Sequence, residues 1–192
     1  TLDDCNLSYE IESISPSNWL SATAFKPTFI KRKLIQFDEA LLYIDIDAIV
    51  HQNFEPYFQS IKEDIALHYT ASGELLSGVI FIKNNTATMQ LLELWIEKMA
   101  INPTVWDQRV LQEILDNSKD ISVCSLPVDY VYIFDTFKKL YPDIKPIIEH
   151  LQASRESKYR EKCLTPKFRF LRFFGGKPKI KKSLKRRRKR MS

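Results

Sequence analysis

Cysteine is scarce in this sequence, and the three residues present, Cys5, Cys124 and Cys163, form no C-x-x-C pair and no metal-ligand spacing. This pattern indicates a reducing, cytosolic compartment. Long hydrophobic runs are also lacking, since those around "ALLYI" and "LLSGVIFI" are too short to cross a bilayer. The first ten residues, "TLDDCNLSYE", are acidic and polar, unlike a signal peptide. We therefore expect a cytoplasmic protein.

Basic residues are few in most of the chain and concentrated at its carboxyl end. Residues 155–192 contain 17 of the 29 lysines and arginines and only 2 of the 24 acidic residues, which gives +15 there and −10 over residues 1–154. The chain has 192 residues, of which 44% are hydrophobic, enough for one globular domain with a sizeable core. The composition changes near residue 158, so we expect a domain over residues 1–158 and a flexible basic tail over 159–192.

Hydrophobic periodicity predicts alternating strands and helices. The clearest helix is "TATMQLLELWIEKMA", with Thr86 or Thr88 as its N-cap. Pro27 falls in the first turn of a predicted helical region. The alternation favours an α/β fold with a mixed sheet and flanking helices. The predicted helices span about residues 20–37, 86–100 and 104–117, and the predicted strands span 7–14, 40–46, 64–70, 75–84 and 121–127.

Two carboxylates interrupt the apolar run "LLYIDIDAIV". In an extended segment Asp45 and Asp47 point to the same side, where their charges repel unless a cation lies between them. Mn²⁺ and Mg²⁺ prefer such oxygen ligands and often bind substrate phosphates as well. Ligands of open α/β sheets bind beyond the carboxyl ends of strands, where these aspartates lie. The alternative interpretation is a solvated loop with two acids.

Several blocks, taken in order, resemble those of the GT-A glycosyltransferases, which use nucleotide-diphospho-sugar donors. The likeness covers roughly residues 5–158, and its blocks are "NWLSATAFKPTFI", "LLYIDIDAIV", "LLSGVIFIKNNTATMQLLELW", "VWDQRVLQEIL", "LPVDYVYIFD" and "PIIEHLQASR". The resemblance implies a GT-A fold, a Mn²⁺ or Mg²⁺ cofactor, a nucleotide-diphosphate sugar donor, and a glycan, lipid or protein acceptor. The domain of such proteins usually opens with a strand and loop that this chain is expected to lack.

The resemblance also implies roles for individual residues. Asp45 and Asp47 would bind the metal and the diphosphate, and His150 would complete the metal site. The other interpretation of His150 is a hydrogen-bonded histidine at a helix end. Asp107 would face the acceptor or the transferred sugar, either as a general base or as a group that orients the sugar. It can instead be an acid favoured by the helix dipole.

Other residues have weaker assignments. Gln108 would bind beside Asp107, and Gly78 would allow the sugar to approach the backbone closely. Lys26 could contact phosphate or the acceptor, although a lysine on a helix is usually solvated. Arg155 and Lys158 could neutralise the leaving diphosphate. For Ser77 we favour a tight strand start over a bond to the sugar, and Trp95 and Trp106 are assigned to the core.

The basic tail has three interpretations: a solvated disordered segment, a contact with an anionic membrane surface, or nucleic-acid binding. The aromatic and cationic residues of "KFRFLRFF" favour the membrane surface and a peripheral location. A nucleic-acid-binding function would explain the basic charge, but it would not explain the six sequence blocks of the domain. A truncated or inactive transferase that acts as a binding module is the remaining non-enzyme hypothesis.

Overall fold

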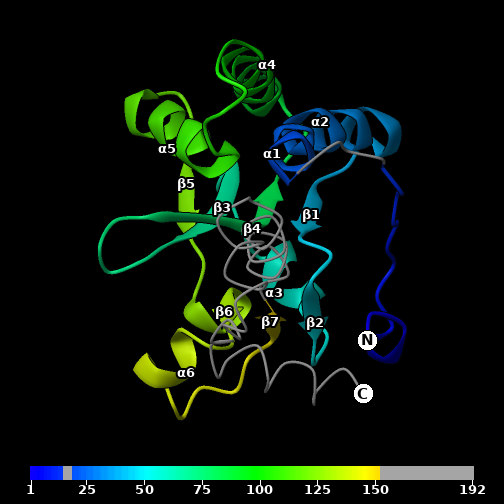
Figure 1. The fold of residues 1–192 in the computed structure, drawn as a ribbon. Coiled ribbons are helices and arrows are strands. Elements are labelled where there is room, and N and C mark those ends of the chain that lie inside the picture. The colour runs from blue at the N-terminus through cyan, green and yellow to red at the C-terminus, as the bar shows by residue number, and fades with distance from the viewer. Residues whose placement is uncertain (15–18, 152–192) are drawn as a thin grey trace, which may run out of the picture.

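The computed structural model describes residues 1–14 and 19–151 of the chain (Figure 1). The first element is the short 3-10 helix η1 (Asp3–Cys5). The strand predicted over residues 7–14 is wrong, because this segment pairs with no other strand. Its alternating acids instead form ion pairs with helix α2, where Glu10 contacts Lys33 and Glu12 lies 2.6 Å from Arg32. The alternation therefore reflects binding of an extended segment to a cationic helix.

The helical region predicted over residues 20–37 consists of two helices, α1 (Trp19–Ala24) and α2 (Lys26–Phe37). Pro27 lies in the first turn of α2, as predicted, because a proline there has no N–H to lose from the helical hydrogen bonds. Asp38, with a left-handed φ of 55°, ends α2 and donates its N–H to the carbonyl of Leu34. The break between α1 and α2 places Lys26 at the start of a helix.

The described strands form two sheets, which confirms the mixed α/β fold. The larger has the order β1-β4-β3-β5, in which β3 and β5 are parallel and the other pairs antiparallel. Its strands are β1 (Leu41–Ile44), β3 (Ile65–Tyr69), β4 (Leu75–Ile82) and β5 (Val123–Ser125). The smaller sheet has the order β2-β7-β6 and contains β2 (Ala48–Val50), β6 (Tyr132–Ile133) and β7 (Ile148–His150).

The long helices lie together at one side of the larger sheet (Figure 1). Helix α4 (Thr86–Ile101) begins after Asn85, whose side chain accepts from the N–H of Thr88 in a capping box. The prediction that Thr86 or Thr88 is the N-cap is therefore wrong by one to three positions. Helix α5 (Asp107–Asn117) follows. The remaining helices are short: α3 (Glu55–Gln59), η2 (Val128–Tyr130) and α6 (Phe137–Leu140).

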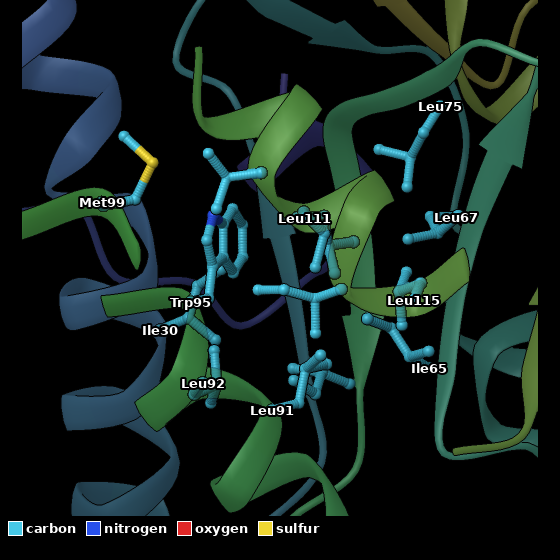
Figure 2. Close-up of a cluster of buried hydrophobic side chains, with 14 of the residues drawn as sticks. Ile30, Ile65, Leu67, Leu75, Leu91, Leu92, Trp95, Met99, Leu111 and Leu115 are labelled. Atoms are coloured by element: carbon cyan, nitrogen blue, oxygen red, sulfur yellow. The ribbon is translucent and has the colours of Figure 1, made fainter. Parts of the chain in front are cut away.

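Hydrophobic side chains pack on both faces of the larger sheet. Along β4, Ile80 and Ile82 face the cluster formed with α2, α4 and α5, whereas Val79 and Phe81 face the cluster formed with the smaller sheet. This alternation follows from the two-residue period of a strand. Figure 2 shows the first cluster, in which Trp95 is 1% exposed. Two packed faces fix β4 at the centre of the fold.

A short turn between β1 and β2 joins the two sheets. In the smaller sheet, β2 is an edge strand that pairs with β7. The pairing brings the end of β7, near residue 150, next to the turn at residues 45–47, about a hundred positions earlier in the chain. Within the described ranges, no helix is both long and apolar enough to cross a membrane.

Candidate active site

Asp45 and Asp47 lie in a tight turn, not in an extended segment. The N–H of Ala48 donates to the carbonyl of Asp45 at 3.0 Å, and Ile46 at the tip is 79% exposed. The prediction that an extended segment directs both aspartates to the same side is therefore wrong in its geometry. The turn is nonetheless anchored on both sides, because Asp45 N–H donates to Gly78 and Leu151 N–H donates to Asp47, at 2.9 and 3.0 Å.

Gly78 lies in β4 at the centre of this arrangement. A Cβ atom on Gly78 would lie 3.4 Å from Oδ2 of Asp45 and 3.1 Å from Cε1 of His150. A side chain there would crowd the His150 ring and contact the Asp45 carboxylate. The missing side chain thus lets Asp45 and His150 approach the same stretch of backbone.

His150 is the last residue of β7 and pairs with Ala48 of β2, so the alternative of a helix-end histidine is wrong. The ring is 4% exposed, and its Nδ1 lies 3.7 Å from Oδ1 of Asp47. Nε2 is buried and has no hydrogen-bond partner within the described part of the chain. A buried polar atom without a partner is costly, which is typical of a functional site.

The donor set of this site suits a hard divalent ion, with carboxylates from Asp45 and Asp47 and an imidazole from His150. The orphaned Nε2 of His150 fits the same chemistry, because a metal ion would give it a partner. As the side chains are placed, no three His, Cys, Asp or Glu side chains of residues 1–14 and 19–151 already surround a common point.

Lys26 is buried, not solvated. Its Nζ donates to the carbonyl of Ser77 at 2.9 Å and forms ion pairs with Asp107 at 3.0 Å and Asp45 at 3.3 Å. Burial alone would lower the pKa of Lys26, but Asp107 and Asp45 outweigh it and hold the pKa above its usual value. Lys26 is therefore a fixed positive charge between two carboxylates.

Asp107 begins helix α5 and is 3% exposed. Its Oδ2 accepts from the Ser77 hydroxyl at 3.2 Å in addition to Lys26, and its carbonyl accepts from the Trp95 indole at 3.1 Å. Ser77 is therefore part of a buried polar network and not only the start of a strand. The helix-dipole interpretation of Asp107 is incomplete, because the side chain faces inward to Lys26.

Tyr43 is a member of the site that the sequence interpretation missed. Its hydroxyl donates to Oδ1 of Asp45 at 2.8 Å, and its ring lies 5.1 Å from Nζ of Lys26. Burial, together with Asp45, raises the pKa of Tyr43, so the hydroxyl keeps its proton and remains a donor. The sequence signal that could have identified Tyr43 is its position two residues before Asp45, at the end of β1.

Other predicted site residues lie away from the Asp45–His150 region or are not among the residues that the structure describes. Gln108 donates to Glu74 at 3.0 Å at the surface. Arg155 and Lys158 lie outside the described residues, as does the whole basic tail over residues 159–192. Trp95 belongs to the core as predicted, but Trp106 does not: it is 39% exposed, with the Arg109 guanidinium 5.7 Å from its ring.

The sequence model of the nucleotide-diphospho-sugar transferase family matches residues 16–164, more than half of the chain. The chain therefore belongs to this family of glycosyl-transfer enzymes. No curated protein matches its sequence significantly.

The family match and the first of the following solved structures, whose fold this chain shares, confirm the expected GT-A class. A glycosyltransferase involved in the glycosylation of the major capsid of PBCV-1 is 13% identical, with a TM-score of 0.57 over 80% of this chain and 81% of that one. GlyE of Streptococcus pneumoniae TIGR4 is 23% identical, with a TM-score of 0.48 over 67% of this chain and 36% of GlyE. Mouse xyloside xylosyltransferase 1 is 12% identical, with a TM-score of 0.46 over 74% and 67%.

Proposed function

We propose that this protein is a metal-dependent glycosyltransferase that moves a sugar from a nucleotide-diphosphate donor to a hydroxyl group of a glycan, a lipid-linked glycan or a protein. The observation that carries the proposal is the place of His150, which lies beside Asp45 at Gly78 and 3.7 Å from Asp47. Its buried Nε2 has no hydrogen-bond partner among the residues that the structure describes. The family supplies the class of donor.

Asp45, Asp47 and His150 would hold the ion, which we assign as Mn²⁺ or Mg²⁺. When bound, such an ion stabilises the negative charge that develops on the leaving diphosphate. The two carboxylates lie on one turn anchored to Gly78 and Leu151, so the protein fixes their backbone before any ligand arrives. Fixed ligands avoid the reorganisation that a mobile loop would require.

We assign Asp107 to the orientation and electrostatic support of the transferred sugar. Its Oδ2 is already engaged by the Lys26 ammonium and the Ser77 hydroxyl, so this oxygen is not open to an acceptor hydroxyl. That arrangement suits a fixed negative charge better than a general base. The side chain is also held by helix α5, which gives it a defined direction.

Supporting roles are proposed for further residues. Gly78 keeps the floor of the site open, and Gln108 lies next to Asp107 at the start of α5. Arg155 and Lys158 follow His150 within eight positions of the sequence, and their charge would neutralise the released diphosphate.

A donor-hydrolysis and transfer assay tests the assignment. UDP- and GDP-sugars are incubated with the protein, with and without Mn²⁺, and release of nucleotide is measured. Asp45→Ala and Asp47→Ala should abolish the Mn²⁺-dependent rate, whereas Asp120→Ala, at an exposed position away from the turn, should leave it unchanged. Full activity in the first two variants would contradict the site. Nucleotide binding without turnover would favour a binding module.

We also propose that the tail over residues 159–192 binds anionic membrane surfaces and keeps the enzyme peripheral on the cytoplasmic side. Its charge and its "KFRFLRFF" segment support this proposal, and nucleic acid is the less favoured partner. Pelleting with phosphatidylserine vesicles should be salt-sensitive and should be lost when residues 160–192 are deleted. Unchanged pelleting after the deletion, or steep salt-dependent RNA binding instead, would contradict it.

A further inference from the structure

The ammonium of Lys26 has four acceptors around it. They are the Ser77 carbonyl at 2.9 Å, Asp107 Oδ2 at 3.0 Å, the Ser77 hydroxyl at 3.2 Å and Asp45 Oδ1 at 3.3 Å. A lysine has three N–H donors, so these partners use its hydrogen-bonding capacity fully. The side chain is 5% exposed. A donor phosphate therefore has neither a free proton nor open access at Lys26.

The two oxygens of Asp45 have different surroundings. Oδ1 accepts from the Tyr43 hydroxyl at 2.8 Å and faces Lys26, whereas Oδ2 lies on the side of Gly78 and His150. The hydrogen bond from Tyr43 and the ion pair with Lys26 together fix the rotation of the carboxylate. As a result, Oδ2 is directed to the side on which His150 and Asp47 meet.

Lys26 also joins segments that are distant in sequence. It begins helix α2 and contacts the turn after β1, the third residue of β4 and the first residue of α5. We propose that Lys26 is a positioning residue that holds the carboxylates of Asp45 and Asp107 in a fixed relative orientation without touching the donor. This inference rests on the proposed function, because it assigns Asp45 to the diphosphate end and Asp107 to the sugar.

Orientation, not stability, is the main effect of such a cluster. Buried ion pairs contribute little net stability, because the desolvation of the charges offsets their attraction. Two carboxylates arranged around one ammonium do, however, restrict each other to one geometry. Reacting groups that are displaced by about 1 Å lose about a hundredfold in rate.

The test is a steady-state comparison using whichever of UDP-glucose, UDP-galactose, UDP-N-acetylglucosamine and GDP-mannose gives the fastest Mn²⁺-dependent hydrolysis. Lys26→Met should lower kcat about a hundredfold while KM for the donor changes less than about twofold. Lys31→Met, on the same helix but paired with Glu93 at the surface, is the matched control and should change neither constant. A raised KM with an unchanged kcat would instead mean that Lys26 binds the donor directly, and unchanged constants would mean a purely structural role; either overturns the inference.

Lys26→Met leaves Asp107 without its cation, so Tyr43→Phe provides a second variant that creates no unpaired charge. It removes the hydrogen bond to Asp45 Oδ1, leaves the ion pair with Lys26, and should lower kcat about three- to tenfold, again with KM unchanged. An unchanged kcat in this variant would contradict the orientation of Asp45. If the wild-type protein hydrolyses none of the four donors, the proposed function fails, and that result is visible before any variant is made.

Discussion

Nζ of Lys26 lies 3.0 Å from Oδ2 of Asp107, and each side chain is only 5% exposed. Removal of the lysine leaves a buried carboxylate without its cation. We predict that Lys26→Met lowers the free energy of unfolding by about 3–5 kcal/mol, measured by urea denaturation. The surface variant Lys31→Met should cost about 0–1 kcal/mol.

The double variant Lys26→Met/Asp107→Asn sharpens this prediction. Removing both charges should recover a large part of the stability lost in Lys26→Met, because the buried carboxylate is gone and the remaining one, Asp45, is 37% exposed. Additive losses in the double variant would show that the two residues do not interact as the structure indicates.

Substitutions at Gly78 and Gly73 together test the close approach of Asp45 and His150 to the Gly78 backbone. Gly78→Ala places a methyl group 3.1 Å from His150 Cε1, and we expect a loss of about 1–3 kcal/mol together with a weaker response to Mn²⁺ and nucleotide. Gly73 has a φ of +79° and open space around it, so Gly73→Ala should lower stability but leave the ligand response intact. Thermal melts with and without ligand separate the two effects.

Asn85 is the N-cap of α4. Asn85→Ala should cost about 1 kcal/mol, because the N–H of Thr88 loses its acceptor. Thr86→Ala, at one of the two cap positions that the sequence pattern offered, should stay within about 0.5 kcal/mol of the wild type. Equal losses in the two variants, measured by urea denaturation, would contradict the assigned cap.

The carboxyl group of Asp64 makes the free energy of unfolding depend on pH in the acidic range. Hydrogen bonds from Ser122, and then from Asn85, hold the pKa of Asp64 below its usual value of 3.8. A carboxyl with a lowered folded-state pKa contributes stability above its unfolded pKa and loses it as the pH falls through the folded value. Asp64→Asn should therefore flatten the loss of stability below about pH 4. A control at an exposed loop acid, Asp143→Asn, should retain the wild-type profile.

The sequence was sufficient to predict those helices and strands that are determined by the pattern of neighbouring residues. Helix α4 and strand β4 were found because a buried face repeats at the period of a helix or a strand, and the motif around Asp45 was found by its position after β1. The segment over residues 7–14 was misassigned because its alternation matches that of a strand, whereas its acids bind α2.

The polar network was not predictable from local pattern. A lysine in a helical segment is usually solvated, and only the packing of α2 against β4 and α5 shows that Lys26 is buried between two carboxylates. The same holds for Ser77 and Tyr43, whose hydroxyls bond to residues brought together by the fold. His150 was identified by resemblance, but its place on β7 beside Asp47 required the pairing of β2 with β7.

The most direct test of the account is a thermal shift measured with UDP and with GDP, each in the presence and absence of Mn²⁺. A ligand that binds only the folded state raises the melting temperature by mass action. We predict a Mn²⁺-dependent rise with one nucleotide, which is lost in Asp47→Asn and retained in Asp120→Asn. A folded protein with no shift for either nucleotide, or with equal shifts in Asp47→Asn, would contradict a metal-dependent nucleotide site at Asp45, Asp47 and His150.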